Sequence, residues 1–203
     1  MNKIAVVTGG SGGIGRCTAA SLKAAGCTVY EISRRDIPSD GIIHMSADIT
    51  DEAQVRRVID EIAAREGRID ILVNNAGFGI SGAAELTESR DSHAQLELNV
   101  FGTDNVTRAV LPHMRAQGGG RIVCMSSIAG IVPIPFQLWY SVSKAAIIAY
   151  VLALQNEVRP FGISICAIMP GDIASGFTDA RRKSAAGDDV YAGRIERSVA
   201  VME

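Results

Sequence analysis

A glycine-rich turn between a strand pattern and a helix pattern is the feature that most constrains how this chain can fold. Residues 3–8 (K-I-A-V-V-T) are typical of a buried strand, and T-G-G-S-G-G-I-G follows at once over residues 8–15. Residues 16–26 then give a helix pattern that closes on a glycine. Such a turn brings backbone amides to the N-terminus of a helix, where the partial positive charge holds a pyrophosphate.

Three glycines of this turn have expected roles. We expect Gly9 to permit the tight turn, Gly13 to let the backbone approach the phosphates, and Gly15 to let the helix pack close to the strand. The alternative is a flexible glycine loop that binds no ligand.

Strand and helix patterns alternate along the chain, which predicts a parallel α/β sheet with helices on both faces. No repeat, low-complexity tract or linker divides the 203 residues, so we expect a single domain over residues 1–203. The expected strands are residues 3–8, 27–33, 41–46, 69–74, 120–126 and 162–169, and the expected helices are residues 13–25, 51–66, about 88–117 and 139–160.

The composition excludes several classes of protein. The net charge of −2 gives no overall field that would favour nucleic acid or an anionic membrane. The longest apolar run, residues 145–154, is shorter than the roughly 20 residues of a membrane span, and the N-terminus leads straight into a strand without a signal peptide. The cysteines lack metal-ligand spacing, so we expect no metal and a cytoplasmic protein with reduced thiols at Cys17, Cys27, Cys124 and Cys166.

Tyr140 and Lys144 lie four residues apart at the start of an apolar helix pattern, and Ser127 precedes them at the end of a strand pattern. Residues four apart share one face of a helix. Because an ammonium favours a phenolate, this spacing predicts a tyrosine that exchanges its proton nearer neutral pH than its reference pKa of about 10 allows. The same spacing alone also fits a surface tyrosine and lysine.

Together these patterns resemble the short-chain dehydrogenase/reductase family. Four more segments match it in order: N-N-A-G at residues 74–77, Asn99 in a helix pattern, Ser126-Ser127 after a strand pattern, and Pro170-Gly171 after the next. The resemblance runs from about residue 3 to residue 178. It implies a Rossmann-type, doubly wound, three-layer α/β/α fold and an NAD(P)-dependent oxidoreductase that acts on CH–OH groups.

The resemblance assigns catalytic roles to Asn99, Ser127, Tyr140 and Lys144. Tyr140 would donate its proton to the carbonyl oxygen, and Ser127 would hydrogen-bond the same oxygen. Lys144 would lower the tyrosine pKa and bind the nicotinamide-ribose hydroxyls, while Asn99 would kink its helix and hold a water that leads to the lysine. The alternatives are a serine that caps a turn and an asparagine whose amide is satisfied in the core.

Cofactor choice depends on the end of the second strand, where Ser33 is followed by Arg34 and Arg35. A carboxylate there grips the ribose 2′-hydroxyl of NAD, whereas a cation holds the 2′-phosphate of NADP. We therefore expect NADP(H) as the cofactor, with NAD as the alternative. The arginines could also be surface residues of a solvated loop that contact no cofactor. Glu31 lies two residues earlier and is expected on the strand itself.

The remaining cofactor contacts also follow from the resemblance. Asp48 resembles the family's adenine contact, or else it is a turn or helix-capping aspartate. The expected cofactor-binding residues are Gly9, Ser11, Gly13, Ile14, Gly15, Arg34, Asp48, Asn75, Ala76, Gly77, Tyr140, Lys144, Pro170, Gly171 and Ile173.

The expected substrate pocket is apolar, with Arg181 and Arg182 as the nearby cations on an expected mobile loop. We therefore expect an apolar alcohol or ketone as the small-molecule substrate. A 3-oxoacyl-carrier reductase of fatty-acid synthesis and a non-catalytic, dinucleotide-binding redox sensor are the alternatives. The pocket candidates are Ile131, Val132, Pro133, Ile134, Pro135, Phe136, Leu138, Trp139, Phe78, Ile80, Met169 and Phe177.

Two expectations concern the end of the chain and its assembly. Residues 172–203 are polar and are expected to form a substrate-loop region; Tyr191, Ile195, Val199 and Met202 recur there at helical spacing. The resemblance implies one more strand and helix beyond this point, so either the sequence is a shortened piece or this member lacks the last strand. Residues 145–154 are apolar around the whole helix, and such a surface is normally buried. We expect this helix and the one at about 88–117, with apolar positions such as Leu96, Val100, Val106, Val110 and Leu111, to pair with a second copy in a homodimer or homotetramer. The alternative is that a further C-terminal segment covers this face within one chain.

Overall fold

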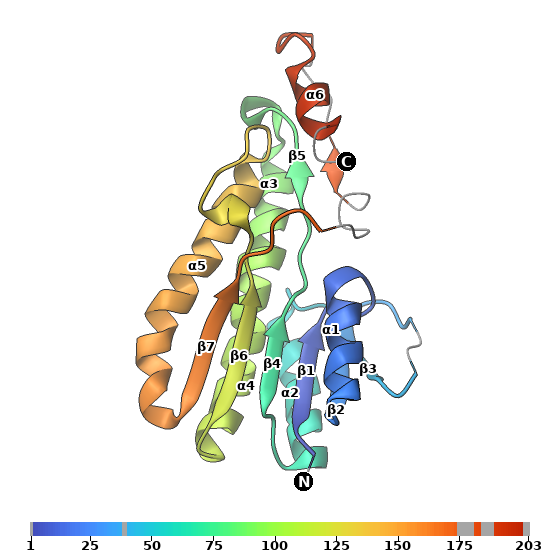
Figure 1. Ribbon diagram of the computed structural model, residues 1–203, viewed down its shortest axis with the longest axis vertical. Helices are drawn as coiled ribbons and strands as arrows, with labels where there is room; N and C mark the ends of the chain where they lie inside the picture. Colours follow the sequence, from blue (N-terminus) through green and yellow to red (C-terminus); the bar gives the residue numbers. More distant parts are fainter. Residues whose placement is uncertain (1, 38–39, 174–180, 184–188, 201–203) are drawn as a thin grey trace.

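The computed structural model describes all residues except 1, 38–39, 174–180, 184–188 and 201–203. Six parallel strands form one sheet in the order β3-β2-β1-β4-β6-β7 (Figure 1). This order confirms the expected doubly wound parallel sheet. The strands are β1 (Ile4–Thr8), β2 (Thr28–Ser33), β3 (Ile43–Ser46), β4 (Ile71–Asn74), β6 (Gly120–Met125) and β7 (Ile163–Ile168).

Helices cover both faces of this sheet, which confirms the three-layer α/β/α fold (Figure 1). The larger core packs β-strand side chains such as Val6 and Ile122 against one group of helices. A smaller core, which includes Val7, Ala19 and Val29, lies under α1 on the other face. The first group is α2 (Glu52–Glu66), α4 (Gly102–Ala116) and α5 (Leu138–Val158), and α1 covers Gly13–Ala24.

Local sequence sets the bounds of α2. The Asp51 carboxylate accepts hydrogen bonds from the backbone N–H groups of Ala53 and Gln54 at 3.0 and 3.1 Å, which caps the helix N-terminus. Gly67 ends the helix with a left-handed φ of 73°. These two signals explain why the expected helix, residues 51–66, matches the observed one within a residue.

The single helix expected at about 88–117 is wrong in one respect, because it is divided into three parts. α3 (Ser89–Leu96) is followed by a π-helical turn, η2 (Glu97–Phe101), and then by α4. Asn99 lies in the π turn, and its side-chain amide bonds the backbone of Phe78 in another segment. A π turn inserts an extra residue into a helix and is frequent at functional sites.

Three short elements lie outside the expected pattern. β5 (Ile80–Ser81) and β8 (Arg182–Lys183) form a second, two-stranded parallel sheet, and α6 spans Arg194–Ala200. Arg182 therefore lies in a strand rather than in the expected loop: its guanidinium bonds Asp91 at 2.9 Å and lies 5.2 Å from the centre of the Phe78 ring. Ile195 is buried in α6 as its helical spacing indicated, whereas Met202 and the Val199 side chain are outside the described part of the chain.

The glycine turn is packed against the end of β4. A Cβ atom at Gly15 would lie 2.3 Å from the Gly9 carbonyl oxygen and 2.4 Å from Nδ2 of Asn75. A side chain at this position would therefore force α1 away from the sheet. At Gly12, one turn earlier, a Cβ atom would meet nothing within 4 Å, and φ is −163°, an extended value that any residue adopts.

We predict that Gly15→Ala lowers the free energy of unfolding by about 1–3 kcal/mol through overpacking, although alanine is the better helix former. Gly12→Ala is the matched control and should change stability by less than about 0.5 kcal/mol. Urea denaturation of the three proteins measures both values. Equal losses at the two glycines would contradict the packing argument.

Candidate active site

The N-terminus of α1 is open to an anion. Its N-cap residue, Gly12, supplies no side-chain cap, and the first turn contains no acidic residue. The Gly9 N–H donates to the Ile32 carbonyl at 2.8 Å, and this bond holds the turn against the end of β2. The positive end of the helix dipole thus faces the carboxyl edge of the sheet, where ligands of such folds bind.

Asn75 and Thr8 join the glycine turn to β4. The Thr8 hydroxyl accepts the backbone N–H groups of Asn75 and Ala76, both at 3.0 Å. In return, the Asn75 amide donates to the carbonyl oxygens of Thr8 at 3.0 Å and Gly9 at 3.3 Å. Two loops that are 67 residues apart in the sequence are therefore locked together.

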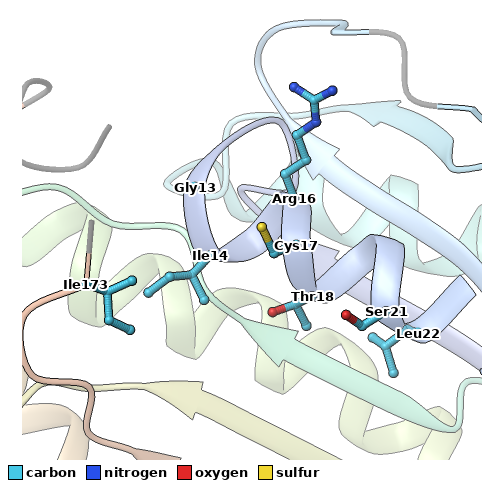
Figure 2. A pocket seen from close by; sticks show the side chains of 8 residues that line it. All are labelled: Gly13, Ile14, Arg16, Cys17, Thr18, Ser21, Leu22 and Ile173. Atoms are coloured by element: carbon cyan, nitrogen blue, oxygen red, sulfur yellow. The ribbon is translucent and has the colours of Figure 1, made fainter. Parts of the chain in front are cut away.

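A cavity of about 610 Å³ lies beside the start of α1 (Figure 2). The lining comes from α1 and from the segment after β7, where Ile173 lies next to Ile14; the α1 residues are Gly13, Ile14, Arg16, Cys17, Thr18, Ser21 and Leu22. The structure therefore brings Ile173 to the start of α1, while most of the cavity extends along the side of that helix. Ser11 lies half-buried within the turn.

The segment after β7 is tied to the end of β6. The carbonyl oxygen of Pro170 accepts the Ile128 N–H at 3.0 Å. A Cβ atom at Gly171 would meet open space, so backbone is exposed there for a ligand to approach. Phe177 of the expected pocket lies outside the described residues.

The end of β2 places cations beside the expected adenosine position. Arg34 is exposed, and its guanidinium lies 3.7 Å from Oδ2 of Asp48. Oδ1 of Asp48 accepts the Thr50 N–H at 3.0 Å and the Thr50 hydroxyl at 2.8 Å. Asp48 thus makes the turn interaction that was its alternative interpretation, while its second oxygen faces Arg34.

Ser127, Tyr140 and Lys144 gather at the C-terminal edge of the sheet. The Tyr140 and Ser127 side chains are hydrogen-bonded, and the Ser127 oxygen also accepts the Ala129 N–H at 3.2 Å. Lys144 is buried, and its ammonium donates to the Met125 carbonyl at 2.7 Å. The expected proximity of the three side chains is therefore present.

The pKa of Tyr140 differs from the expectation. Burial raises it, and the bond from Ser127 and the charge of Arg181 oppose that rise. The Lys144 ammonium is bonded to the Met125 carbonyl and lies 5.7 Å from the ring centre of the tyrosine. Burial also lowers the pKa of Lys144 to about 8.

Asn99 orders the opposite wall of the site. Its Oδ1 accepts the Phe78 N–H, and its Nδ2 donates to the Phe78 carbonyl and to the Ser143 hydroxyl, all at 3.0 Å. Ser143 donates in turn to the Tyr140 carbonyl at 2.7 Å. Asn99 therefore connects the N-N-A-G segment to the helix that carries the tyrosine, and its amide is satisfied, as in the alternative interpretation.

Gly77 lies where these parts meet. A Cβ atom there would lie 3.0 Å from Oδ1 of Asn99 and 3.8 Å from Nζ of Lys144. At Gly9, Gly15 and Gly77 a side chain would collide with neighbouring parts of the protein, so the backbone packs closely there, and we call this part of the site the glycine cradle. This cradle and the uncapped helix N-terminus fit a nicotinamide dinucleotide.

Two residues that the motifs did not single out support the site. Thr8 anchors Asn75 and Ala76, and Ser143 links Asn99 to Tyr140. In the sequence, only their places beside motif residues could have indicated this role: Thr8 opens the glycine turn and Ser143 directly precedes Lys144. Hydroxyls at such places are common, so only their contacts identify them.

The apolar residues before Tyr140 are not all part of its pocket. A second cavity of about 500 Å³ is lined by Pro133, Ile134, Pro135, Phe136, Leu138 and five residues of neighbouring segments. Three of those five, Ser141, Val142 and Ala145, are on α5. At 100° per residue Val142 and Ala145 point away from the face that carries Tyr140 and Lys144, and Ser141 lies at the side of that face. Residues 133–138 therefore lie partly behind the catalytic helix.

We predict that Lys144→Met raises the free energy of unfolding at pH 7 by about 1–3 kcal/mol, because it removes a buried ammonium at the cost of one hydrogen bond. The pKa falls from 10.5 to about 8 on folding, so between these values the unfolded chain binds more protons. The stability of the wild type should therefore rise, relative to the variant, as pH increases from 8 to 10.5.

Urea denaturation across this pH range measures the difference between the two proteins. Burial raises the pKa of Cys124 to about 11, which gives an opposite slope. Both proteins carry this thiol, so only the part of its effect that the Lys144 charge causes remains in the difference. If the difference in the free energy of unfolding between the two proteins does not change with pH, Lys144 is not buried as a cation.

Comparison with known proteins agrees with this geometry. A family model described as short chain dehydrogenase matches residues 3–186. The 3-ketodihydrosphingosine reductase of Bacteroides thetaiotaomicron is 41% identical over 99% of this chain and 76% of its own length. The 3-oxoacyl-(acyl-carrier-protein) reductase of Thermotoga maritima is 32% identical over 87% of this chain and 76% of its own length.

Solved structures give the same result. A short-chain dehydrogenase from Streptomyces avermitilis superposes with a TM-score of 0.86 and 34% identity, over 100% of this chain and 82% of its own. An NAD⁺-bound xylitol dehydrogenase superposes with a TM-score of 0.79 and 32% identity, over 84% of this chain and 70% of its own. These matches show that the chain belongs to the short-chain dehydrogenase/reductase family, whose members use a nicotinamide dinucleotide to act on CH–OH and keto groups.

Proposed function

We propose that this enzyme interconverts an apolar ketone and its alcohol with NADP(H), and that Tyr140 is the acid/base. The observation that carries this proposal is the hydrogen bond between Ser127 and Tyr140 beside the buried Lys144. Buried proton-transfer groups held in mutual contact at the edge of a cofactor cradle are typical of catalysis.

The side chains divide the work of the reaction. The dinucleotide supplies or accepts the hydride at the reacting carbon. Tyr140 donates its proton to the carbonyl oxygen during reduction, and takes a proton back from the alcohol in the reverse direction. Ser127 holds the same oxygen by a hydrogen bond, and its bond to Tyr140 stabilises the phenolate that remains.

Lys144 and the glycine cradle serve the cofactor. The Lys144 ammonium lies near Gly77 and has donors left beyond its bond to Met125, so it can hold ribose hydroxyls. The amides at the N-terminus of α1 hold the pyrophosphate. Gly9, Gly15 and Gly77 let the backbone come close, Asn75 and Ala76 fix the turn, and Pro170, Gly171 and Ile173 line the nicotinamide end.

NADP is favoured over NAD by the charge at the end of β2. Arg34 and Arg35 are exposed there, and the residue before them is Ser33 rather than an acid. A guanidinium holds a phosphate by charge-assisted hydrogen bonds. NAD is the alternative cofactor, because the similar xylitol dehydrogenase structure contains bound NAD⁺.

The apolar substrate is supported by the exposed side chains that follow Ser127. Ile128, Ile131 and Val132 are 50–62% exposed at this edge of the sheet. The relative from Bacteroides thetaiotaomicron acts on a keto compound by its name, which supports the reductive direction.

The relative from Thermotoga maritima supports 3-oxoacyl-carrier reduction as the second candidate, and Arg181 and Arg182 are the cations that a carrier would contact. A non-catalytic redox sensor is not supported by membership of this enzyme family.

We predict that Tyr140→Phe lowers turnover by about 10²-fold or more, because it removes the proton donor and keeps the ring. NADPH binding should persist in a fluorescence titration. Tyr150→Phe is the matched control: the Tyr150 hydroxyl bonds Asp104, and its loss should leave turnover nearly unchanged. Oxidation of NADPH and of NADH, assayed over ketones and 3-oxoacyl thioesters, separates the two candidate functions. Near-normal turnover of Tyr140→Phe would refute the acid/base role.

We also propose a homodimer or homotetramer that uses the outer face of α5. Leu138, Val142 and Leu152 on this helix are 42–59% exposed, and Phe101 beside it is 54% exposed. The expected contribution of Val106 and Val110 is wrong, since both are buried in the core of the same chain. α5 with its following turn is long and apolar enough to cross a membrane, but Ile147, Val151 and Val158 pack in the core, as in a core helix.

Light scattering should therefore give at least twice 21.4 kDa. Leu152→Arg places a charge on the exposed face and should shift the mass toward the monomer, because burying an unpaired charge in an interface is costly. Leu86→Arg, at an exposed leucine elsewhere, is the control. A soluble wild-type monomer would refute this interface.

The cytoplasmic location remains a prediction. Cys17, Cys27, Cys124 and Cys166 are free thiols in the structure, which is typical of a reducing compartment.

A further inference from the structure

The short strand β8 is attached to the active site through Arg182. The backbone N–H of Arg182 donates to the Gly79 carbonyl at 3.0 Å, and the pairing of β8 with β5 sets it opposite Ile80. Its guanidinium bonds Asp91 on α3 at 2.9 Å and lies over the Phe78 ring. Backbone and side chain together therefore fix β8 beside the segment that follows the N-N-A-G motif.

The segment that receives β8 is itself held by the catalytic part of the molecule. The Phe78 carbonyl accepts the side-chain amides of Gln95 and Asn99, both at 3.0 Å. Directly after β5, the Gly82 N–H donates to the Phe136 carbonyl at 2.8 Å, in the loop that leads to Tyr140. β8 is therefore bonded to the framework that positions the tyrosine.

Arg181 directly precedes β8, and its side chain interacts with the catalytic tyrosine. It is half-buried, and its Nε is closed off from solvent. Burial lowers the pKa of Arg181, while the phenolate form of Tyr140 and the Asp172 carboxylate act in the opposite direction. In turn, the charge of Arg181 opposes the rise that burial causes in the pKa of Tyr140. Guanidinium and phenol therefore lie within electrostatic range of each other.

The other polar groups around the tyrosine leave Arg181 with a role of its own. Lys144, on α5, lies 5.7 Å from the centre of the Tyr140 ring. Ser127, at the end of β6, bonds the tyrosine and is neutral. Asp172 is exposed, so solvent screens much of the negative charge that it places beside Arg181. Arg181 is thus a second cation near Tyr140, and it comes from a different segment than Lys144.

We propose that Arg181 is a positioning residue that acts through Tyr140 by stabilising its phenolate, an inference that rests on the proposed acid/base role of the tyrosine. In ketone reduction the Tyr140 O–H bond breaks as the proton passes to the carbonyl oxygen, and the electron pair stays on the phenolate. The guanidinium stabilises this negative charge, because an opposite charge favours the ionised form. In alcohol oxidation the same phenolate accepts the proton, so Arg181 increases the fraction of enzyme that is ready to react.

Arg181→Met tests this role, because methionine keeps an unbranched side chain and removes the charge. The substrate is the secondary alcohol that corresponds to the best ketone of the assay panel. Below the pKa of Tyr140, the phenolate fraction should fall about tenfold, and kcat/KM for oxidation should fall with it, which moves the pH profile upward by about one pH unit. Arg181→Lys restores a cation and should recover most of the rate. Arg90→Met removes an exposed arginine that pairs with Glu88, and as the matched control it should leave the profile unchanged.

A titration without substrate separates this inference from the proposed function. The ultraviolet absorbance of phenolate is followed as the pH rises, in each protein and in the same protein with Tyr140→Phe. The difference isolates the ionisation of Tyr140 from that of the other tyrosines. Its onset should lie about one pH unit higher in Arg181→Met than in the wild type. Circular dichroism defines the pH range in which each protein is folded, and Arg181→Gln replaces Arg181→Met if that variant does not fold.

The outcomes distinguish the charge interaction from the acid/base role. Equal onsets of Tyr140 ionisation in the wild type and in Arg181→Met would overturn the role of Arg181, whatever the activity. An equal loss of turnover in Arg181→Lys and Arg181→Met, with an unchanged pH profile, would also overturn it, because such a loss indicates a structural role. A shifted onset together with near-normal turnover of Tyr140→Phe would overturn the acid/base role and confirm that Arg181 stabilises the phenolate.

Discussion

The hydrogen bonds between Asn75 and the glycine turn are the interaction on which the rest of the site depends. They join the carboxyl ends of β1 and β4, the two central strands, and they exist only because Gly15 carries no side chain. In a parallel sheet all strands end at the same edge. The Asn75 hydrogen bonds fix the glycine turn at that edge. They therefore also fix the position of the N-terminus of α1, which directly follows the turn.

A second constraint comes from the burial of Lys144. The ammonium is held by the Met125 carbonyl, while the Lys144 carbonyl accepts the Ser126 hydroxyl at 2.7 Å. The end of β6 and the start of α5 are thus bonded at two points, and Ser127 and Tyr140 belong to the same two segments. The cost of a buried cation is a reason to expect a function for it, since a neutral side chain would serve packing better.

Both ends of the cofactor site therefore contain a buried ionisable group held by neighbouring strands. At one end Lys144 lies against Gly77, and at the other Glu31 lies against Gly10. At Gly10 a Cβ atom would lie 2.7 Å from Cβ of Glu31, so a side chain there would displace the acid. At Gly77 it would lie 3.0 Å from Oδ1 of Asn99 and in ordinary contact with the Lys144 ammonium.

The sequence by itself determined the order of strands and helices, because hydrophobic periodicity and caps such as Asp51 and Gly67 act over a few residues. Motif spacing also predicted that Tyr140 and Lys144 share one face of a helix, since the separation along a helix decides which side chains lie together. Ser127 is not on that helix, and its hydrogen bond with Tyr140 depends on the tertiary structure. The π turn at Asn99, the β5–β8 sheet and the burial of Glu31 beside His44 were decided by tertiary structure alone. Each depends on a partner more than ten residues away. The raised pKa of Tyr140 has the same origin: burial by distant segments outweighs the neighbouring charges that the local spacing could show.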